Sequence, residues 1–85
     1  MKKRILLVDD ESSICTFLSI ALEDEFDVYT ANSREEACRI LKERKIHLAL
    51  LDLLLGESNG LDILQEIKAK YPETAVIMMT AYGDI

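Results

Sequence analysis

Two apolar runs of this chain each end at aspartate residues. Residues 5–8 are followed by Asp9 and Asp10, and residues 48–51 are followed by Asp52. If both runs are strands of one parallel sheet, three carboxylates meet at its carboxyl edge, where open α/β sheets bind their ligands. Carboxylates this close repel one another unless a cation lies among them. The pattern therefore predicts a site for a hard divalent ion such as Mg²⁺, which prefers oxygen ligands.

The composition describes one small folded domain. The chain has 85 residues, of which 49% are hydrophobic and 31% charged, with one proline and three glycines. These values exclude disordered and fibrous classes, and the length allows a single domain with a modest core. Sixteen acidic residues against ten basic ones give a net charge of −6. That balance argues against direct nucleic-acid binding, which requires a basic surface.

The chain shows no secretion or membrane signal. Three cations follow Met1, but only four apolar residues come before the aspartates, too few for a signal peptide. No apolar run approaches the length of a membrane span. Cys15 and Cys38 lie far from any C-x-x-C or zinc spacing, so we interpret them as reduced thiols that serve in packing. These features predict a cytoplasmic protein.

The first half of the chain alternates strand and helix patterns. Residues 4–8 form an apolar run typical of a buried strand, and residues 26–30 form a second short strand. Between them an apolar stripe with helical spacing predicts a helix over residues 12–24. Ser33 and Glu36 make a capping box for the next helix. That helix should end near residues 44–45, where cations suit the negative end of its dipole.

The second half continues the alternation. Residues 46–51 predict a third strand, in which His47 is a packed or edge residue, and residues 53–60 predict a loop. Apolar residues from Leu61 onward favour a third helix, ended by Pro72 because proline cannot continue a helix. Residues 75–79 predict a fourth strand. Four strands alternating with three helices are typical of a parallel sheet with right-handed crossovers.

Three motifs taken together resemble the receiver domain of two-component response regulators. They are the run Ile5-Leu6-Leu7-Val8-Asp9-Asp10-Glu11, then Leu51-Asp52-Leu53 with Gly60 eight residues after the aspartate, and finally Met79-Thr80-Ala81-Tyr82-Gly83. The resemblance implies a flavodoxin-like α/β fold with strand order 2-1-3-4 and helices on both faces. It also implies that the fifth strand and the last helices lie beyond residue 85. We therefore expect residues 1–85 to be about the first two thirds of a receiver.

The resemblance also implies a role for each motif residue. Asp52 matches the phosphoacceptor, whose carboxylate attacks the phosphorus of a phosphohistidine on a sensor histidine kinase. Asp9 and Asp10 match the acidic pair that holds Mg²⁺, with Asp52 and the backbone carbonyl of Leu54 completing the protein ligands. Thr80 matches the hydroxyl residue that hydrogen-bonds the phosphoryl group and switches conformation. Ala81 matches the small residue that leaves room for that group and binds it through its backbone.

Two departures from the family pattern affect the expected function. Gly56 stands where the family often has proline, so the loop before the third helix should be less fixed. The lysine that ends the family's fifth strand would lie beyond residue 85. Because that lysine pairs with the acylphosphate, we expect the 85-residue form to be impaired in phosphorylation or switching.

The resemblance implies a phosphoacceptor that catalyses its own phosphorylation and dephosphorylation, not an enzyme acting on other substrates. The expected partner is a sensor histidine kinase, with no membrane contact. Residues 80–84 resemble receivers that precede ATP-driven transcription activators, which indicates transcription regulation. Strand 75–79 is apolar and would form an open sheet edge, so we also expect self-association there.

Three other functions are compatible with a small α/β chain of this kind. An aspartate-nucleophile phosphatase usually has D-x-D after its first strand, whereas this chain has Asp9, Asp10 and Glu11. A mononucleotide or flavin binder needs a glycine- or hydroxyl-rich loop there, and these acids would repel phosphate. The alternative that stays open is a pseudo-receiver, an interaction module that keeps the fold without being phosphorylated. Beryllofluoride with Mg²⁺ separates the two, since only a working phosphoacceptor site binds this mimic tightly.

Overall fold

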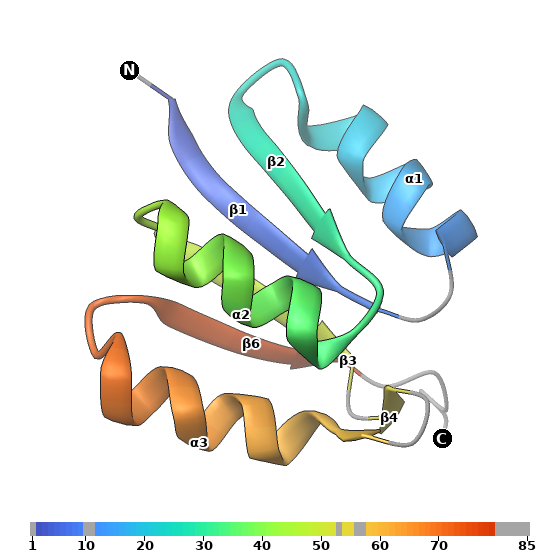
Figure 1. Cartoon of the computed structure of the whole chain (residues 1–85). Helices are drawn as coiled ribbons and strands as arrows, with labels where there is room; N and C mark the ends of the chain where they lie inside the picture. Colours follow the sequence, from blue (N-terminus) through green and yellow to red (C-terminus); the bar gives the residue numbers. More distant parts are fainter. Residues whose placement is uncertain (1, 10–11, 53, 56–57, 80–85) are drawn as a thin grey trace.

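The protein is built on a four-stranded parallel sheet (Figure 1). A computed structural model describes residues 2–9, 12–52, 54–55 and 58–79. The sheet contains four strands in the order β2-β1-β3-β6, which are β1 (Lys3–Val8), β2 (Phe26–Ala31), β3 (Leu48–Asp52) and β6 (Ala75–Met79). All three strand pairs are parallel. The predicted order 2-1-3-4 is confirmed, with β6 as the fourth strand.

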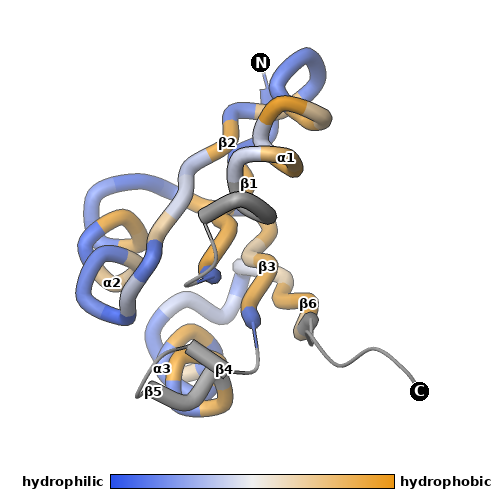
Figure 2. Tube along the Cα trace, turned by 90° about the vertical axis from the view of Figure 1, so that its right-hand side faces the viewer, coloured by the Kyte–Doolittle hydropathy of each residue, from blue (hydrophilic) through white to orange (hydrophobic). Residues whose placement is uncertain are grey.

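Helices cover both faces of this sheet, as predicted. They are α1 (Ser12–Leu22), α2 (Arg34–Glu43) and α3 (Gly60–Lys70). α1 lies on one side of the sheet against β2, whereas α2 and α3 lie together on the other side (Figures 1 and 2). Helix α1 ends two residues earlier than predicted because residues 23–25 form a turn, in which the Glu25 N–H donates to the Leu22 carbonyl. None of these helices, in the described part of the chain, is long and apolar enough to span a membrane.

The predicted capping box sets the start of α2. The Ser33 hydroxyl accepts a hydrogen bond from the Glu36 backbone N–H at 3.2 Å. In return, the Glu36 carboxylate accepts from the Asn32 backbone N–H at 2.7 Å, one residue before the cap. The two bonds give partners to the Glu36 and Asn32 backbone N–H groups, which have no helical carbonyl to bind at the start of α2. At the other end, the Arg44 N–H donates to the Ile40 carbonyl as α2 stops.

The structure also differs from the predictions at β3 and in the segment that follows it. β3 begins at Leu48 rather than at residue 46, because the Ile46 carbonyl accepts from the Thr74 hydroxyl at 2.7 Å. The segment predicted as a loop over residues 53–60 contains a small antiparallel pair, β4 (Leu54–Leu55) with β5 (Ser58–Asn59). Strands of two residues are too short to produce the alternation by which a strand is recognised in a sequence. The fourth strand, in contrast, is confirmed at both ends.

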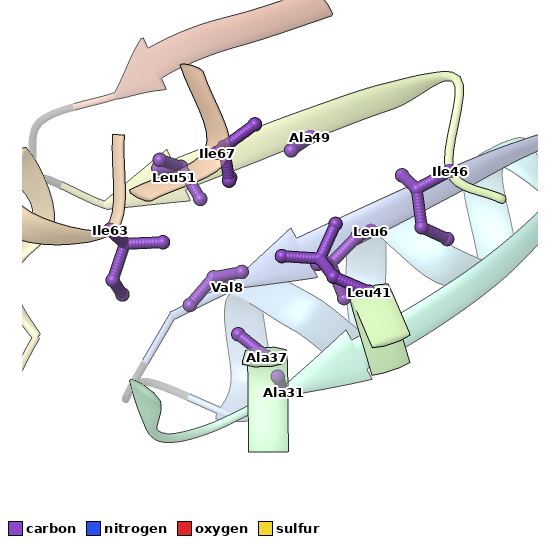
Figure 3. Close-up of a cluster of buried hydrophobic side chains, with 10 residues drawn as sticks. All are labelled: Leu6, Val8, Ala31, Ala37, Leu41, Ile46, Ala49, Leu51, Ile63 and Ile67. Atoms are coloured by element: carbon purple, nitrogen blue, oxygen red, sulfur yellow. The ribbon is translucent and has the colours of Figure 1, made fainter. Parts of the chain in front are cut away.

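We call the side of the sheet that faces α2 and α3 the closed face. Alternate residues of the strands pack there with both helices (Figure 3). All ten side chains of this cluster are at most 4% exposed, and they are Leu6, Val8, Ala31, Ala37, Leu41, Ile46, Ala49, Leu51, Ile63 and Ile67. Removing this apolar surface from water is the main contribution to stability that the described residues show.

We call the other side, on which α1 lies, the open face. Among the side chains that the structure describes, Ile5 and Leu7 form its buried centre, with partly buried neighbours from α1, β2 and β3 around them. Three large apolar side chains belonging to α1 and β6 remain exposed, namely Phe17 at 70%, Ile20 at 63% and Ile77 at 51%. In the described part of the chain, α1 is the only helix on this face. The open face is therefore only partly covered.

Candidate functional site

The two aspartates described at the carboxyl edge lie on neighbouring strands. Val8 of β1 pairs with Leu51 of β3, so Asp9 and Asp52 each follow directly after one register pair. Both are buried, with exposed fractions of 3% and 7%. Burial of two carboxylates side by side is costly for their charged forms unless donors or a cation compensate. This edge of the sheet therefore holds two buried carboxyl groups at the ends of neighbouring strands.

The backbone fixes the position of Asp9. Its N–H donates to the Ala31 carbonyl at 3.0 Å, which extends the β1–β2 ladder past the end of β1. Its own carbonyl accepts from the Asn32 side-chain amide at 3.1 Å. Asp52 is fixed differently, because it is the last residue of β3 and pairs with Met79 of β6. Asp52 thus belongs to the sheet, and Asp9 is hydrogen-bonded to it one residue beyond β1.

The structure describes only part of the predicted site. Asp10, Thr80 and Ala81 lie outside the described residues, as does Gly56. Leu54 lies in β4, two residues beyond Asp52. Within the described ranges, no group of three or more His, Cys, Asp or Glu side chains could hold a metal ion. The assigned roles of all six residues, Asp9, Asp10, Asp52, Leu54, Thr80 and Ala81, remain predictions.

The donor set at this edge fits a hard cation. Asp9 and Asp52 offer carboxylate oxygens, and no described histidine or cysteine accompanies them that would favour a softer metal. Mg²⁺ commonly binds to one or two protein carboxylates and fills its remaining positions with waters and phosphate oxygens. The first turns of α2 and α3 also begin near this edge and contain Glu35, Glu36 and Asp62. The surroundings are therefore acidic as well.

A second polar cluster joins α2 to α3 and was missed by the sequence analysis. The Glu66 carboxylate accepts from Arg34 Nη2 at 3.0 Å, from Cys38 Sγ at 3.3 Å and from Lys70 Nζ at 3.4 Å. The hydrogen bond from Arg34, followed by that from Cys38, lowers the pKa of Glu66. Burial, followed by the bond to Glu66, raises the pKa of the Cys38 thiol. Of these contacts, only the Glu66–Lys70 pair could have been recognised in the sequence, because its residues lie four apart on one helix.

His47 lies at the opposite, amino edge of the sheet. The His47 ring Nδ1 accepts a hydrogen bond from the Arg4 backbone N–H at 3.0 Å. The His47 backbone N–H donates to the Arg4 carbonyl at 2.9 Å. Desolvation, with further contributions from Lys3, Lys45 and Arg4, lowers the pKa of His47. The uncharged form of the imidazole ring is therefore favoured at this position. The prediction of a packed residue rather than a ligand agrees with these contacts.

Comparison with known proteins identifies one family that agrees with the observed fold. The family model described as "Response regulator receiver domain" matches residues 5–85. The alginate biosynthesis transcriptional regulatory protein AlgB of Pseudomonas putida is 46% identical over 83 residues, which are 96% of this chain and 18% of AlgB. The response regulator protein PilR of Pseudomonas aeruginosa is 36% identical over 85 residues. The chain spans less than a fifth of the length of these curated relatives.

Solved structures give the same result. A CheY-like response regulator receiver domain protein from Methanospirillum hungatei superposes with a TM-score of 0.92 at 29% identity, covering all of this chain and 69% of the other. A response regulator from Burkholderia pseudomallei, solved with a phosphorylated aspartic acid, a calcium ion and citrate, has a TM-score of 0.90 at 26% identity. This match covers 99% of this chain and 50% of the other.

Proposed function

Because the chain belongs to the response regulator receiver domain family, we propose that Asp52 accepts a phosphoryl group from a sensor histidine kinase in a Mg²⁺-dependent reaction. Phosphorylation would control an output, here transcription, through a conformational switch. The observation that carries this proposal is the pair of buried aspartates, Asp9 and Asp52, at adjacent strand ends. The aspartyl phosphate and calcium ion in the Burkholderia pseudomallei relative support the same chemistry.

The transfer needs a positioned nucleophile more than it needs acid or base groups. An Asp52 carboxylate oxygen forms the bond to phosphorus as the phosphorus–nitrogen bond of the phosphohistidine breaks, and the imidazole leaves with the bonding electron pair. Phosphoryl transfer proceeds through a loose transition state, so alignment and charge neutralisation supply most of the catalysis. Asp52 is suited to alignment because it stands inside the sheet at the end of β3. Thr80 and Ala81 would bind oxygen atoms of the transferred phosphoryl group.

A bound Mg²⁺ would be held by Asp9, Asp10, Asp52 and the Leu54 carbonyl. It would supply positive charge against the phosphoryl oxygens and relieve the repulsion among the carboxylates. The chain itself catalyses transfer to and hydrolysis from its own aspartate, so we class it as a phosphoacceptor rather than as an enzyme acting on other molecules.

Beryllofluoride titration tests this function directly. With Mg²⁺ present, the chain should bind the mimic, and backbone NMR signals near Asp9 and Asp52 should shift. Asp52→Asn should abolish binding, whereas the matched control Asp27→Asn, an exposed position in β2, should leave it unchanged. Omission of Mg²⁺ should also abolish binding. Equal binding by the Asp52→Asn variant would contradict the proposal.

The pseudo-receiver alternative makes a different prediction in the same experiment. A folded chain that binds neither Mg²⁺ nor beryllofluoride would be an interaction module. The impaired form expected for the isolated 85 residues lies between the two outcomes, because it would bind the metal yet incorporate phosphate slowly from a small phosphodonor such as phosphoramidate. Incorporation at ordinary receiver rates would contradict impairment and leave the phosphoacceptor assignment standing.

We propose in addition that isolated 85-residue chains associate through β6. Within the described residues β6 pairs on one side only, with β3, and its five residues carry no charge. An uncharged edge strand offers unpaired backbone groups to a second chain. Ile77, half exposed on this strand, adds apolar contact area.

Light scattering over a range of concentrations tests this association. The chain should behave as a dimer or larger species, and Ile77→Lys should shift it toward monomer because a charge on the edge opposes pairing. Leu61→Lys is the control, since Leu61 is 45% exposed on α3, which packs on the other side of the sheet. A monomeric parent chain would rule the association out.

A further inference from the structure

Most of the basic residues of this chain lie at one end of the sheet. Eight of the ten lysines and arginines lie at the amino edge, because they precede β1, begin it, or fall near the ends of α2 and α3. They are Lys2, Lys3, Arg4, Lys42, Arg44, Lys45, Lys68 and Lys70. Acidic residues share this edge, among them Glu23, Asp24 and Glu25 in the turn before β2, and Glu43 and Glu73. The excess of basic residues is therefore confined to the corner formed by the ends of α2 and α3.

A hollow of about 500 Å³ opens at this basic end. It is lined by residues 41–46, from the end of α2 to the approach to β3, and by residues 70–74, between α3 and β6. We call it the amino-end groove. Its volume lies within the range of ligand-binding pockets. Four basic and two acidic residues line it, so it is positive although the molecule is negative.

The groove combines an apolar floor with a cationic rim. Leu41 and Ile46 are buried and Tyr71 is half-buried, which gives the floor. On the rim, the Arg44 guanidinium lies 4.9 Å from the centre of the Tyr29 ring, and Lys45 pairs with Glu73 at 3.5 Å. Both members of the Lys45–Glu73 pair are largely exposed, at 68% and 83%. Exposed pairs contribute little and exchange readily, so Lys45 is available to another carboxylate.

We propose that the amino-end groove binds a short acidic peptide segment of a partner protein, with one apolar side chain on the floor and carboxylates on the Lys42, Lys45 and Lys70 rim. A small inorganic anion would leave the apolar floor unused. Nucleic acid would meet a chain of strongly negative net charge. An acidic segment with an apolar residue matches both parts of the groove, since charge complementarity sets orientation and apolar contact adds affinity.

The helix dipole accounts for part of this surface. Cations in the last turn of a helix are favoured by its negative end, which accounts for Lys42 and Lys70. Arg44 caps the C-terminus of α2 and Lys45 follows it, so the same dipole favours both of these cations. The dipole does not account for the apolar floor of the groove, which is the part that an apolar side chain of a partner would use.

NMR titration with a synthetic peptide tests the proposal. The probe is an end-blocked hexapeptide, Asp-Glu-Leu-Glu-Asp-Glu, added to the 85-residue chain at low salt without Mg²⁺. Backbone signals of residues 41–46 and 70–74 should shift, and those near Asp9 and Asp52 should not. The neutral peptide Asn-Gln-Leu-Gln-Asn-Gln, and a version with serine in place of leucine, should each bind at least about tenfold more weakly.

Charge reversal on the protein provides the matched control. Lys45→Glu should weaken peptide binding by about tenfold or more. Lys68→Glu, in the last turn of α3 but outside the groove lining, should change it by less than about twofold. Both sites are exposed, so circular dichroism should show the same fold. Equal weakening by the two variants, equally tight binding of inorganic pyrophosphate, or no shift at millimolar peptide would each overturn the proposal.

Discussion

The closed and open faces of the sheet differ in how completely helices cover them. Among the described side chains, ten are buried between the sheet and two helices on the closed face, whereas two, Ile5 and Leu7, are buried on the open face. The exposed Phe17, Ile20 and Ile77 belong to α1 and β6. Since hydrophobic stabilisation follows the apolar area removed from water, most of the stability should come from the layer between the sheet and α2 and α3. The open face contributes less and remains free for contacts.

The largest expected effect is on the free energy of unfolding, when isoleucine is replaced by alanine on each of the two faces. Ile67→Ala removes a side chain with no exposure from the closed face and should cost about 3 kcal/mol. Ile77→Ala removes one that is 51% exposed and should cost less than about 1 kcal/mol. Urea unfolding followed by circular dichroism measures both. Equal losses would show that the two faces do not differ in stability.

The polar cluster of Glu66 gives the next largest effect. Glu66→Gln removes the charge that joins Arg34, Cys38 and Lys70 and should cost about 1 kcal/mol, a value limited by the exposure of both cations. Because the pKa of Glu66 is lowered in the folded state, its stabilisation is present above the ordinary pKa of 4.5 and is lost as the pH falls below that value.

Unfolding curves at pH 7 and pH 3 separate this effect from packing. The difference between the parent chain and Glu66→Gln should shrink at the lower pH. Glu73→Gln, which changes a fully solvated pair with Lys45, should show almost no difference at either pH.

Polar substitution on the open face should affect the accessible apolar surface more than stability. Phe17→Ser and Ile20→Ser replace side chains that are 70% and 63% exposed, so each should change the free energy of unfolding by about 0.5 kcal/mol or less. Both should reduce binding of a hydrophobic dye such as ANS, because less apolar surface is accessible. Unchanged dye binding would show that this surface is covered in solution.

The smallest effect concerns His47, which lies where β1 and β3 approach each other. Its lowered pKa means that its contribution to stability is present above 6.5 and is lost as the pH falls from 6.5 toward the folded-state value. Protonation would also remove the acceptor for the Arg4 N–H. In His47→Asn an amide oxygen can keep that bond without titrating. The variant should therefore lose part of the pH dependence of unfolding between pH 7 and pH 5.

Much of the fold could be predicted from the spacing of apolar residues along the sequence and from the residues that cap helices. Residues 75–79, an apolar run between turn residues, form β6 with the predicted bounds, and Ser33 caps α2 as its spacing to Glu36 indicates. The β4–β5 pair could not be predicted, since two-residue strands have no period. The Glu66 cluster depends on how α2 packs beside α3, because Cys38 lies 28 residues away in the sequence. Local patterns do not contain that information.

For the candidate site, the sequence identified which aspartates follow strands but not how deeply they are buried. The parallel register explains why Asp9 and Asp52 reach the same edge, since each is one residue past the Val8–Leu51 pair. Their burial to 3% and 7% depends on the surrounding chain and had no local signal. The expected partners Asp10, Thr80 and Ala81 lie outside the described residues, so their placement stays a prediction.

The basic corner at the ends of α2 and α3 and the acidic carboxyl edge give the molecule a preferred orientation before any contact forms. A cationic surface would be approached with the Asp9 and Asp52 edge first, and an anionic one with the Lys42–Lys45 corner first. Both encounters should slow as ionic strength rises, because mobile ions weaken the fields beyond about 8 Å in physiological salt. Two partners of opposite sign could thus reach this small chain at the same time without competing for one surface.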